Sequence, residues 1–282
     1  MADYVERMGT ALGIGREETL LRLKAKYDGY HFCWPSPDVY NPFSLLNAFT
    51  NNRLDDYWFG SGTPTYLIEM MRKFSVRPSE IGSKEVMAAD FDAPTERMTD
   101  IVPLLYQSGY LTIKACDTDS ELYLLDIPNT EIRVGLMKSL LPSYLAPNVP
   151  STLVNKAGGA LRRGDMDGAL RLIQEFLLTV PYCDNTDYEG HYQQLLYIIF
   201  SLLGQYVDVE VRTPRGRVDL VMRTRDTLYL VELKLDKGAD TALAQIDLKD
   251  YAARFATCGL PVVKVGIDFD SERRTIGEWK MA

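Results

Sequence analysis

Charged side chains stand inside two of the most apolar segments of this 282-residue chain, and this combination constrains the fold more than any other feature. Residues 228–234, L-Y-L-V-E-L-K, read as a strand buried on both faces. Glu232 and Lys234 are two residues apart, so on a strand both point to one face and Leu233 points to the other. A buried carboxylate and a buried ammonium are costly unless they are paired or bound to something. These positions are therefore candidates for a functional site.

A third charge, Asp219, lies in a similar apolar segment, V-D-L-V-M, thirteen residues before Glu232. Two adjacent antiparallel strands joined by a short turn would bring the two carboxylates together. Their repulsion would be relieved by a divalent cation. We expect Mg²⁺ or Mn²⁺, held by Asp219, Glu232 and a main-chain carbonyl, that of Leu233.

The chemistry expected of this group is phosphodiester hydrolysis. A metal ion held by Asp219 and Glu232 lowers the pKa of a bound water and stabilises charge on a phosphate oxygen. Lys234 would orient the nucleophile or neutralise the transition state.

Two helices that flank the strands offer further candidates. Glu189 lies on a largely apolar helical stripe and would face the sheet, where it could supply another ligand; a first-turn acid that complements the helix dipole is an equal alternative. Gln245 and Tyr251, on the later helix, could hydrogen-bond Lys234 or a phosphate; the alternative for both is ordinary helix surface.

The net charge is −8, which argues against a chain whose whole surface grips nucleic acid. Basic residues nevertheless gather around Asp219. Local charge of this kind can favour phosphate where the total does not. The arginines in this stretch are Arg212, Arg215, Arg217, Arg223 and Arg225. We predict that Arg212, Arg215 and Arg217 bind the nucleic-acid backbone.

Other site types are disfavoured. The longest apolar stretch, Leu195 to Leu203, is too short to cross a bilayer, and the N-terminus has no signal-peptide pattern, so a cytoplasmic protein is expected. Only two histidines, His31 and His191, are present, too few for a histidine metal centre. The four cysteines lie far apart without a C-x-x-C pair, so we expect reduced, mostly buried thiols.

Three segments are predicted along the chain. Residues 1–75 read as helices joined by a long aromatic loop whose rings would plug into the core. Residues 76–150 read as helix, glycine, strand, turn and strand, the order of a winged helix, with acids near the wing that favour a packing role. Residues 151–282 read as a helical pair broken at 164–168, then helix, three strands, helix, strand and strand.

At these residues the chain resembles the PD-(D/E)XK nuclease superfamily. The resemblance implies an α/β (α+β) fold with a restriction-endonuclease-like α-β-β-β-α-β core. Asp219 stands for the first acid, and Glu232 and Lys234 for the E-x-K motif. Glu189 and Gln245 occupy the first-helix acid and second-helix polar positions. The proline before the first acid is replaced by Val218.

The front half resembles the region that follows the motor in bacterial AAA-ATPase-like proteins ending in a PD-(D/E)XK domain. The matching motifs are K-Y-D-G-Y-H-F, V-Y-N-P-F-S-L-L-N and Y-W-F-G-S-G-T-P-T-Y-L-I. The resemblance implies a helical lid in residues 1–75 and a winged-helix-like linker in 76–150. The chain has no G-x-x-x-x-G-K-[ST] loop. We therefore expect a fragment without ATPase activity.

Three functions stay open on the sequence. The first is a magnesium-dependent nuclease acting on DNA, or alternatively on RNA, with a second copy of the chain or a separate ATPase region as further candidate partners. The second is a catalytically inactive module that binds nucleic acid or protein. In the third, Glu232 and Lys234 form only a structural salt bridge.

Overall fold

The computed structural model describes residues 2–61, 64–95, 98–145, 152–180, 188–204, 208–212, 219–224, 226–248 and 259–282. Side chains are described within these ranges except at positions 61, 188–193, 208–212, 219 and 248. Backbone contacts divide the chain into two units, Met1–Ser139 and Leu140–Ala282. The division into the three segments 1–75, 76–150 and 151–282 stays a prediction.

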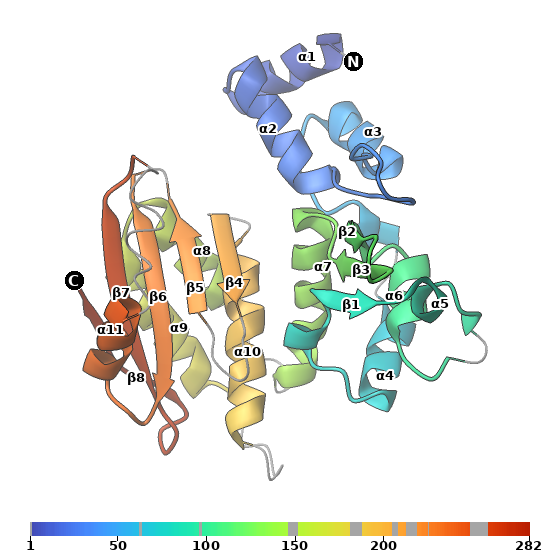
Figure 1. The fold of residues 1–282 in the computed structure, drawn as a ribbon. Coiled ribbons are helices and arrows are strands. Elements are labelled where there is room, and N and C mark those ends of the chain that lie inside the picture. Colours follow the sequence, from blue (N-terminus) through green and yellow to red (C-terminus); the bar gives the residue numbers. More distant parts are fainter. Residues whose placement is uncertain are drawn as a thin grey trace. The chain divides into compact units, whose positions relative to one another are not determined.

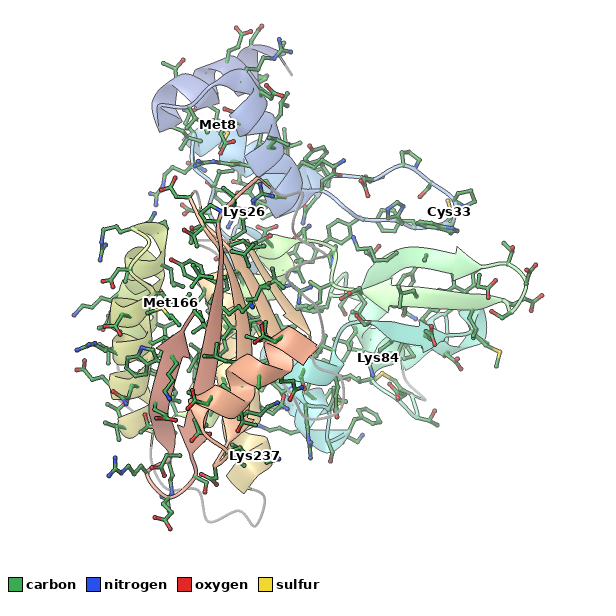
Figure 2. The ribbon with its side chains drawn as sticks, turned by 60° about the vertical axis from the view of Figure 1, so that its left-hand side comes forward. Met8, Lys26, Cys33, Lys84, Met166 and Lys237 are labelled. Atoms are coloured by element: carbon green, nitrogen blue, oxygen red, sulfur yellow. The ribbon has the colours of Figure 1, made fainter. Side chains whose placement is uncertain are left out.

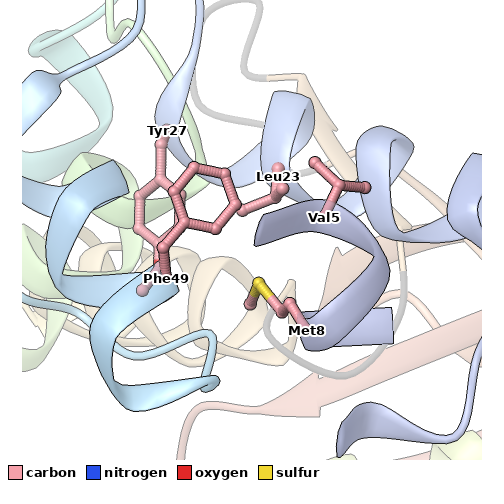
Figure 3. Close-up of a cluster of buried hydrophobic side chains, with 6 residues drawn as sticks. Val5, Met8, Leu23, Tyr27 and Phe49 are labelled. Carbon is pink, nitrogen blue, oxygen red and sulfur yellow. The ribbon is translucent and has the colours of Figure 1, made fainter. Parts of the chain in front are cut away.

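Three helices build the first core of unit 1: α1 (Ala2–Leu12), α2 (Arg16–Tyr27) and α3 (Pro42–Asn51). Apolar residues spaced three and four apart on α1 and α2 meet one ring from α3, and all of them are buried (Figure 3). This cluster contains Val5, Met8, Leu23, Tyr27, Ala48 and Phe49. The Asn41 side chain caps α3, because its Oδ1 accepts the Ser44 N–H at 3.2 Å.

The aromatic loop between α2 and α3 folds back on itself through a bridge between Tyr30 and Val39. Tyr30 is 7% exposed, as predicted for rings that plug into the core, whereas Phe32 is 74% exposed, so for Phe32 that prediction is wrong. His31, between them, is held by contacts from its two ring nitrogens to Ser36 Oγ and Asp38 Oδ1, at 3.0 and 2.9 Å.

The prediction of mostly buried thiols is also wrong for the two cysteines whose side chains the structure describes. Cys33, in this loop, is exposed, and Cys116 is half-buried; both are free thiols. Cys183 and Cys258 lie outside the described residues. Phe32 and Cys33 are adjacent in the part of the loop that lies between the two bridged residues, Tyr30 and Val39.

The rest of unit 1 contains a small antiparallel sheet in the order β1-β3-β2. Gly109, at φ +75°, ends the helix before β2, as predicted. The helix, glycine, strand, turn and strand of the prediction are present, while the winged-helix assignment stays a prediction. The elements are η1 (Trp58–Ser61), α4 (Thr65–Lys73), η2 (Pro78–Glu80), β1 (Lys84–Val86), α5 (Ala88–Phe91), α6 (Val102–Gln107), β2 (Thr112–Asp117), β3 (Leu122–Asp126) and α7 (Thr130–Leu140).

Unit 2 has the predicted order of helical pair, helix, three strands, helix, strand and strand. One boundary differs: α9 begins at Met166 rather than after Gly168, because Asp165 Oδ1 accepts the Gly168 N–H at 2.8 Å and caps the helix early. The elements are η4 (Leu141–Tyr144), α8 (Thr152–Arg162), α9 (Met166–Leu178), α10 (Tyr188–Leu203), β4 (Asp208–Arg212), β5 (Asp219–Arg223), β6 (Leu228–Leu235), α11 (Ala239–Leu248), β7 (Val262–Asp270) and β8 (Thr275–Met281).

The strands of unit 2 form one five-stranded sheet in the order β4-β5-β6-β7-β8. Strands β6 and β7 are parallel and joined through α11, and the other pairs are antiparallel. In Figure 1, α11 covers one face of the sheet and α8 and α9 cover the other. Leu228 and Leu230 of β6 pack with Ile246 of α11, while the Tyr229 hydroxyl donates to the Gly164 carbonyl on the opposite side. The fold is therefore a mixed α/β arrangement with β6 at its centre.

Across the described residues, the helices are either too short or too polar to span a membrane.

Leu23→Ala is expected to lower the free energy of unfolding by about 2–5 kcal/mol, because Leu23 is 1% exposed and its loss leaves a cavity between α1, α2 and α3. Leu21→Ala, two residues away on the same helix and 60% exposed, should change it by no more than about 0.5 kcal/mol. Urea denaturation of the two variants measures the difference, and equal losses would contradict the assignment of this core.

Candidate active site

The candidate site is built on β6, the central strand of the sheet of unit 2. Glu232 is 1% exposed and Lys234 is 6% exposed. They follow Leu228 and Leu230 at intervals of two, so all four lie on the face that α11 covers. The apolar sequence of β6 thus carries two charges into the layer between sheet and helix.

Lys234 connects strand and helix. Its Nζ donates to Glu232 Oε1 at 2.7 Å and also to Gln245 Oε1. Burial of an ammonium is costly unless acceptors replace the water that it loses, and here one carboxylate and one amide oxygen do so. Gln245, predicted as a hydrogen-bond partner of the lysine, is placed in that contact. The ion pair alone fits both the catalytic and the structural-salt-bridge hypotheses.

The first acid position lies beside this pair in the backbone. Asp219 and Glu232 are directly opposite on the antiparallel strands β5 and β6, as the turn between them predicted. Thr224 closes that turn through bonds between its N–H and the Thr227 carbonyl, 2.9 Å, and between its Oγ1 and the same carbonyl, 3.0 Å. Opposite residues on antiparallel strands share a face, with Cα atoms about 4.5–5.5 Å apart. Positions 219 and 232 therefore share the face that α11 covers.

The register extends into a row across the sheet. Arg212 at the end of β4 is opposite Asp219, and Glu232 is opposite Gly266 on β7. The backbone of Arg212, a predicted phosphate-binding residue, is therefore next to the first acid position. Leu233, whose carbonyl was predicted as a ligand, is one step beyond the Asp219–Glu232 pair and pairs with Ile267 on its other side.

The remaining predicted residues are less closely described. Glu189 is in the first turn of α10, but its side chain is not described. Arg215, Arg217 and Tyr251 lie outside the described residues, as does the side chain of Asp219. Their roles stay predictions.

The donors at this point of the sheet suit a hard cation. Mg²⁺ prefers oxygen ligands and typically uses one or two carboxylates, with main-chain carbonyls and waters completing six positions. Glu232 and the Asp219 position offer two carboxylates. Among side chains that the structure describes, no group of three or more His, Cys, Asp or Glu could hold a metal ion. That result does not include Asp219, and a two-carboxylate site does not require a third such residue.

Helix α11 is fastened to the sheet at both ends by charged contacts. Lys280 of β8 pairs with Asp240 in the first turn, and this hydrogen bond raises the pKa of Lys280 above its ordinary value. Lys264 of β7 pairs with Asp247 near the other end. Gln245 is therefore carried by a helix that ion pairs hold on both sides of it. In Figure 2, α11 lies across one face of the sheet.

The order of elements and the register of the charges can be compared with known families. Residues 187–279 match the model of the PD-(D/E)XK nuclease superfamily. The match begins just before α10 and ends within β8, so it contains the whole α10-β4-β5-β6-α11-β7 succession. The region that matches this superfamily is thus the part of unit 2 that carries every candidate catalytic residue.

The chain is also similar to an uncharacterized protein in the vnfD 5′ region of Azotobacter chroococcum mcd 1. The two are 32% identical over 278 residues, which cover 94% of this chain and 52% of the relative. This chain therefore spans about half the length of that relative.

Two positions that lie beside the E-x-K motif in the structure were not predicted from the sequence. Gly266 and Asp268 on β7 are the register partners of Glu232 and Lys234. The only signal is that the apolar strand V-V-K-V-G-I-D-F contains a glycine and an acid two residues apart. That pattern acquires meaning only when β7 is known to lie beside β6.

Lys234→Met is expected to lower the free energy of unfolding of unit 2 by about 3–5 kcal/mol, because it removes the cation next to the buried Glu232 carboxylate. Lys237→Met, on the exposed turn after β6, serves as the control and should change it by no more than about 0.5 kcal/mol. Urea denaturation at neutral pH measures both. The double variant Glu232→Leu/Lys234→Met should recover most of the loss, and a lack of any difference between Lys234→Met and Lys237→Met would contradict the pairing.

Proposed function

We propose that unit 2 is a metal-dependent nuclease that hydrolyses phosphodiester bonds in nucleic acid, with DNA as the preferred substrate. The observation that carries the proposal is that Lys234 bonds both Glu232 and Gln245 while Asp219 is opposite Glu232. The match of residues 187–279 to a nuclease superfamily supports the same conclusion.

In this proposal Asp219, Glu232 and the Leu233 carbonyl hold Mg²⁺ or Mn²⁺. When bound, such an ion lowers the pKa of a coordinated water and stabilises negative charge on a phosphate oxygen. Lys234 orients the attacking water and neutralises charge that develops on the phosphate. Gln245 fixes the direction of the Lys234 ammonium. Overall, the water oxygen bonds to phosphorus as one ester P–O bond breaks, and the departing oxygen takes up a proton.

Flanking residues complete the proposed site. Glu189, in the first turn of α10, would contribute a further carboxylate. The arginines and the tyrosine would hold the substrate backbone, since phosphate contacts position nucleic acid without reading its sequence. These residues are Arg212, Arg215, Arg217 and Tyr251.

We also propose that the first 75 residues are a helical lid derived from an ATPase and that residues 76–150 are a winged-helix-like linker. The order β1-α5-α6-β2-β3 and the sheet β1-β3-β2 support the second assignment. Asp117, Asp119 and Glu121 at the β2–β3 turn are exposed, so this unit suits packing better than a grip on phosphate. A cytoplasmic location, the absence of ATPase activity and association with a second copy or an ATPase region stay predictions.

Purified protein supplied with Mg²⁺ or Mn²⁺ is expected to cut DNA, and chelation should abolish cutting. Asp219→Asn and Lys234→Met should each lower the rate by about 10²-fold or more, because Asp219 would hold the metal ion and Lys234 would neutralise charge on the reacting phosphate. Lys237→Met should cut at the wild-type rate. Labelled single-stranded DNA, duplex DNA and RNA are compared side by side on gels.

Titration calorimetry with Mn²⁺ separates the alternatives. Uptake that is lost in Asp219→Asn supports the metal site. Equal cutting by wild type and Asp219→Asn would assign the activity to a contaminant. Binding of nucleic acid without Mn²⁺ uptake or cutting would instead favour the inactive binding module.

A further inference from the structure

The E-x-K motif on β6 has a structural counterpart on β7. Glu232 pairs with Gly266 and Lys234 pairs with Asp268 in the parallel register. Register partners in a parallel pair lie on one face of the sheet, so Gly266 and Asp268 also face α11. Each has a specific contact with the start of that helix.

Gly266 lies directly under the first turns of α11. A Cβ at this position would be 2.3 Å from the Ala239 carbonyl oxygen, 2.9 Å from Leu243 Cγ and 3.0 Å from the Leu243 nitrogen. Two of these atoms are helix backbone, which a side-chain rotation does not move. Ala239 and Ala242, both fully buried, are the small residues of the helix itself. Any side chain at 266 must therefore lift α11 away from β7.

Asp268 fixes the same end of the helix. Its Oδ1 accepts the N–H groups of Lys237 and Gly238, each at 3.0 Å. Glu278 Oε1 accepts the next N–H, that of Ala239, at 2.9 Å. Helix N-termini leave N–H groups without partners in the helix, and these two carboxylates satisfy them from the sheet.

The position of the helix start determines where Gln245 lies. Gln245 is the sixth residue after Ala239, a rise of about 9 Å along a rigid helix. A shift or tilt at Gly266 and Asp268 is therefore carried to the Gln245 amide, which holds the Lys234 ammonium. Lys234 in turn bonds Glu232, the register partner of Gly266.

We propose that Gly266 and Asp268 are positioning residues: they set α11 against the sheet so that Gln245 directs the Lys234 ammonium. The effect on cleavage rests on the proposed nuclease function, whereas the effect on Lys234 does not. A purely structural role for the two residues would change stability and leave the surroundings of Lys234 as they are.

The test follows Lys234 directly, in protein labelled with ¹³C at lysine Cε, and identifies its NMR signal with Lys234→Arg. In Gly266→Ala the Lys234 signal should shift and its ammonium protons should exchange faster with water, because the contact with Gln245 is lost. Gly159→Ala is the matched control, since its added Cβ meets only Arg163 Nη1, at 3.6 Å.

Two substitutions of Asp268 distinguish the loss of its hydrogen bonds to the start of α11 from the loss of its negative charge. Asp268→Ala should reproduce the Gly266→Ala signal, while Asp268→Asn should stay close to wild type because its Oδ1 still accepts both N–H groups. Asp270→Ala is the control on the same strand, because Asp270 Oδ1 accepts the Arg273 N–H in the β7–β8 turn instead. If Gly266→Ala does not fold, the comparison of Asp268→Ala with Asp268→Asn decides alone.

Cleavage provides the second measurement. Gly266→Ala and Asp268→Ala should lower kcat by about tenfold or more with KM within about twofold, because misplacement of a catalytic group acts on the chemical step. A Lys234 signal unchanged in both variants would overturn the proposal. If the wild type does not cut nucleic acid, the proposed function fails, but the NMR comparison still decides whether Gly266 and Asp268 position Lys234.

Discussion

The burial of two opposite charges on the central strand is the constraint on which unit 2 depends. Seven of the eight residues of β6 are buried, and Glu232 and Lys234 are among them. A charge in such a place requires polar partners at hydrogen-bonding distance, whereas an apolar side chain requires only contact. The strand and the helix above it are therefore held in one geometry by the hydrogen bonds of Lys234 to Glu232 and Gln245.

Helix α11 can supply a polar partner for the buried charges because it is the segment that connects β6 to β7. A parallel pair of strands needs a crossover, and here the crossover helix covers the face that carries the charges. The apolar contacts of Ile246 with Leu228 and Leu230 hold the helix near one end of β6, and Gln245 reaches Lys234 near the other. Two adjacent residues of α11 thus have different tasks: Ile246 packs in the hydrophobic layer, and Gln245 replaces water around the buried Lys234 ammonium.

Much of this arrangement could be predicted from sequence because it depends on local patterns. Strand parity places Glu232 and Lys234 together, and the short turn after Arg223 makes β5 and β6 adjacent. Gly266 and Asp268 could not be found in this way, because their meaning depends on which strand lies beside β7. The exposure of Phe32 was missed for a related reason: an aromatic residue usually indicates burial, but the bridge between Tyr30 and Val39 projects the turn of the loop outward.

The energetics of the buried pair help to separate the structural-salt-bridge hypothesis from the catalytic one. Replacing a buried ion pair by apolar residues of similar volume is often neutral or stabilising, so stability alone is a weak reason for Glu232 and Lys234 to occupy β6. A salt bridge also needs no acid opposite Glu232, yet the register places Asp219 there. Carboxylates held close together repel unless a divalent cation lies between them. The register of Asp219 is therefore better explained by the proposed metal site than by an ion pair that serves the fold alone.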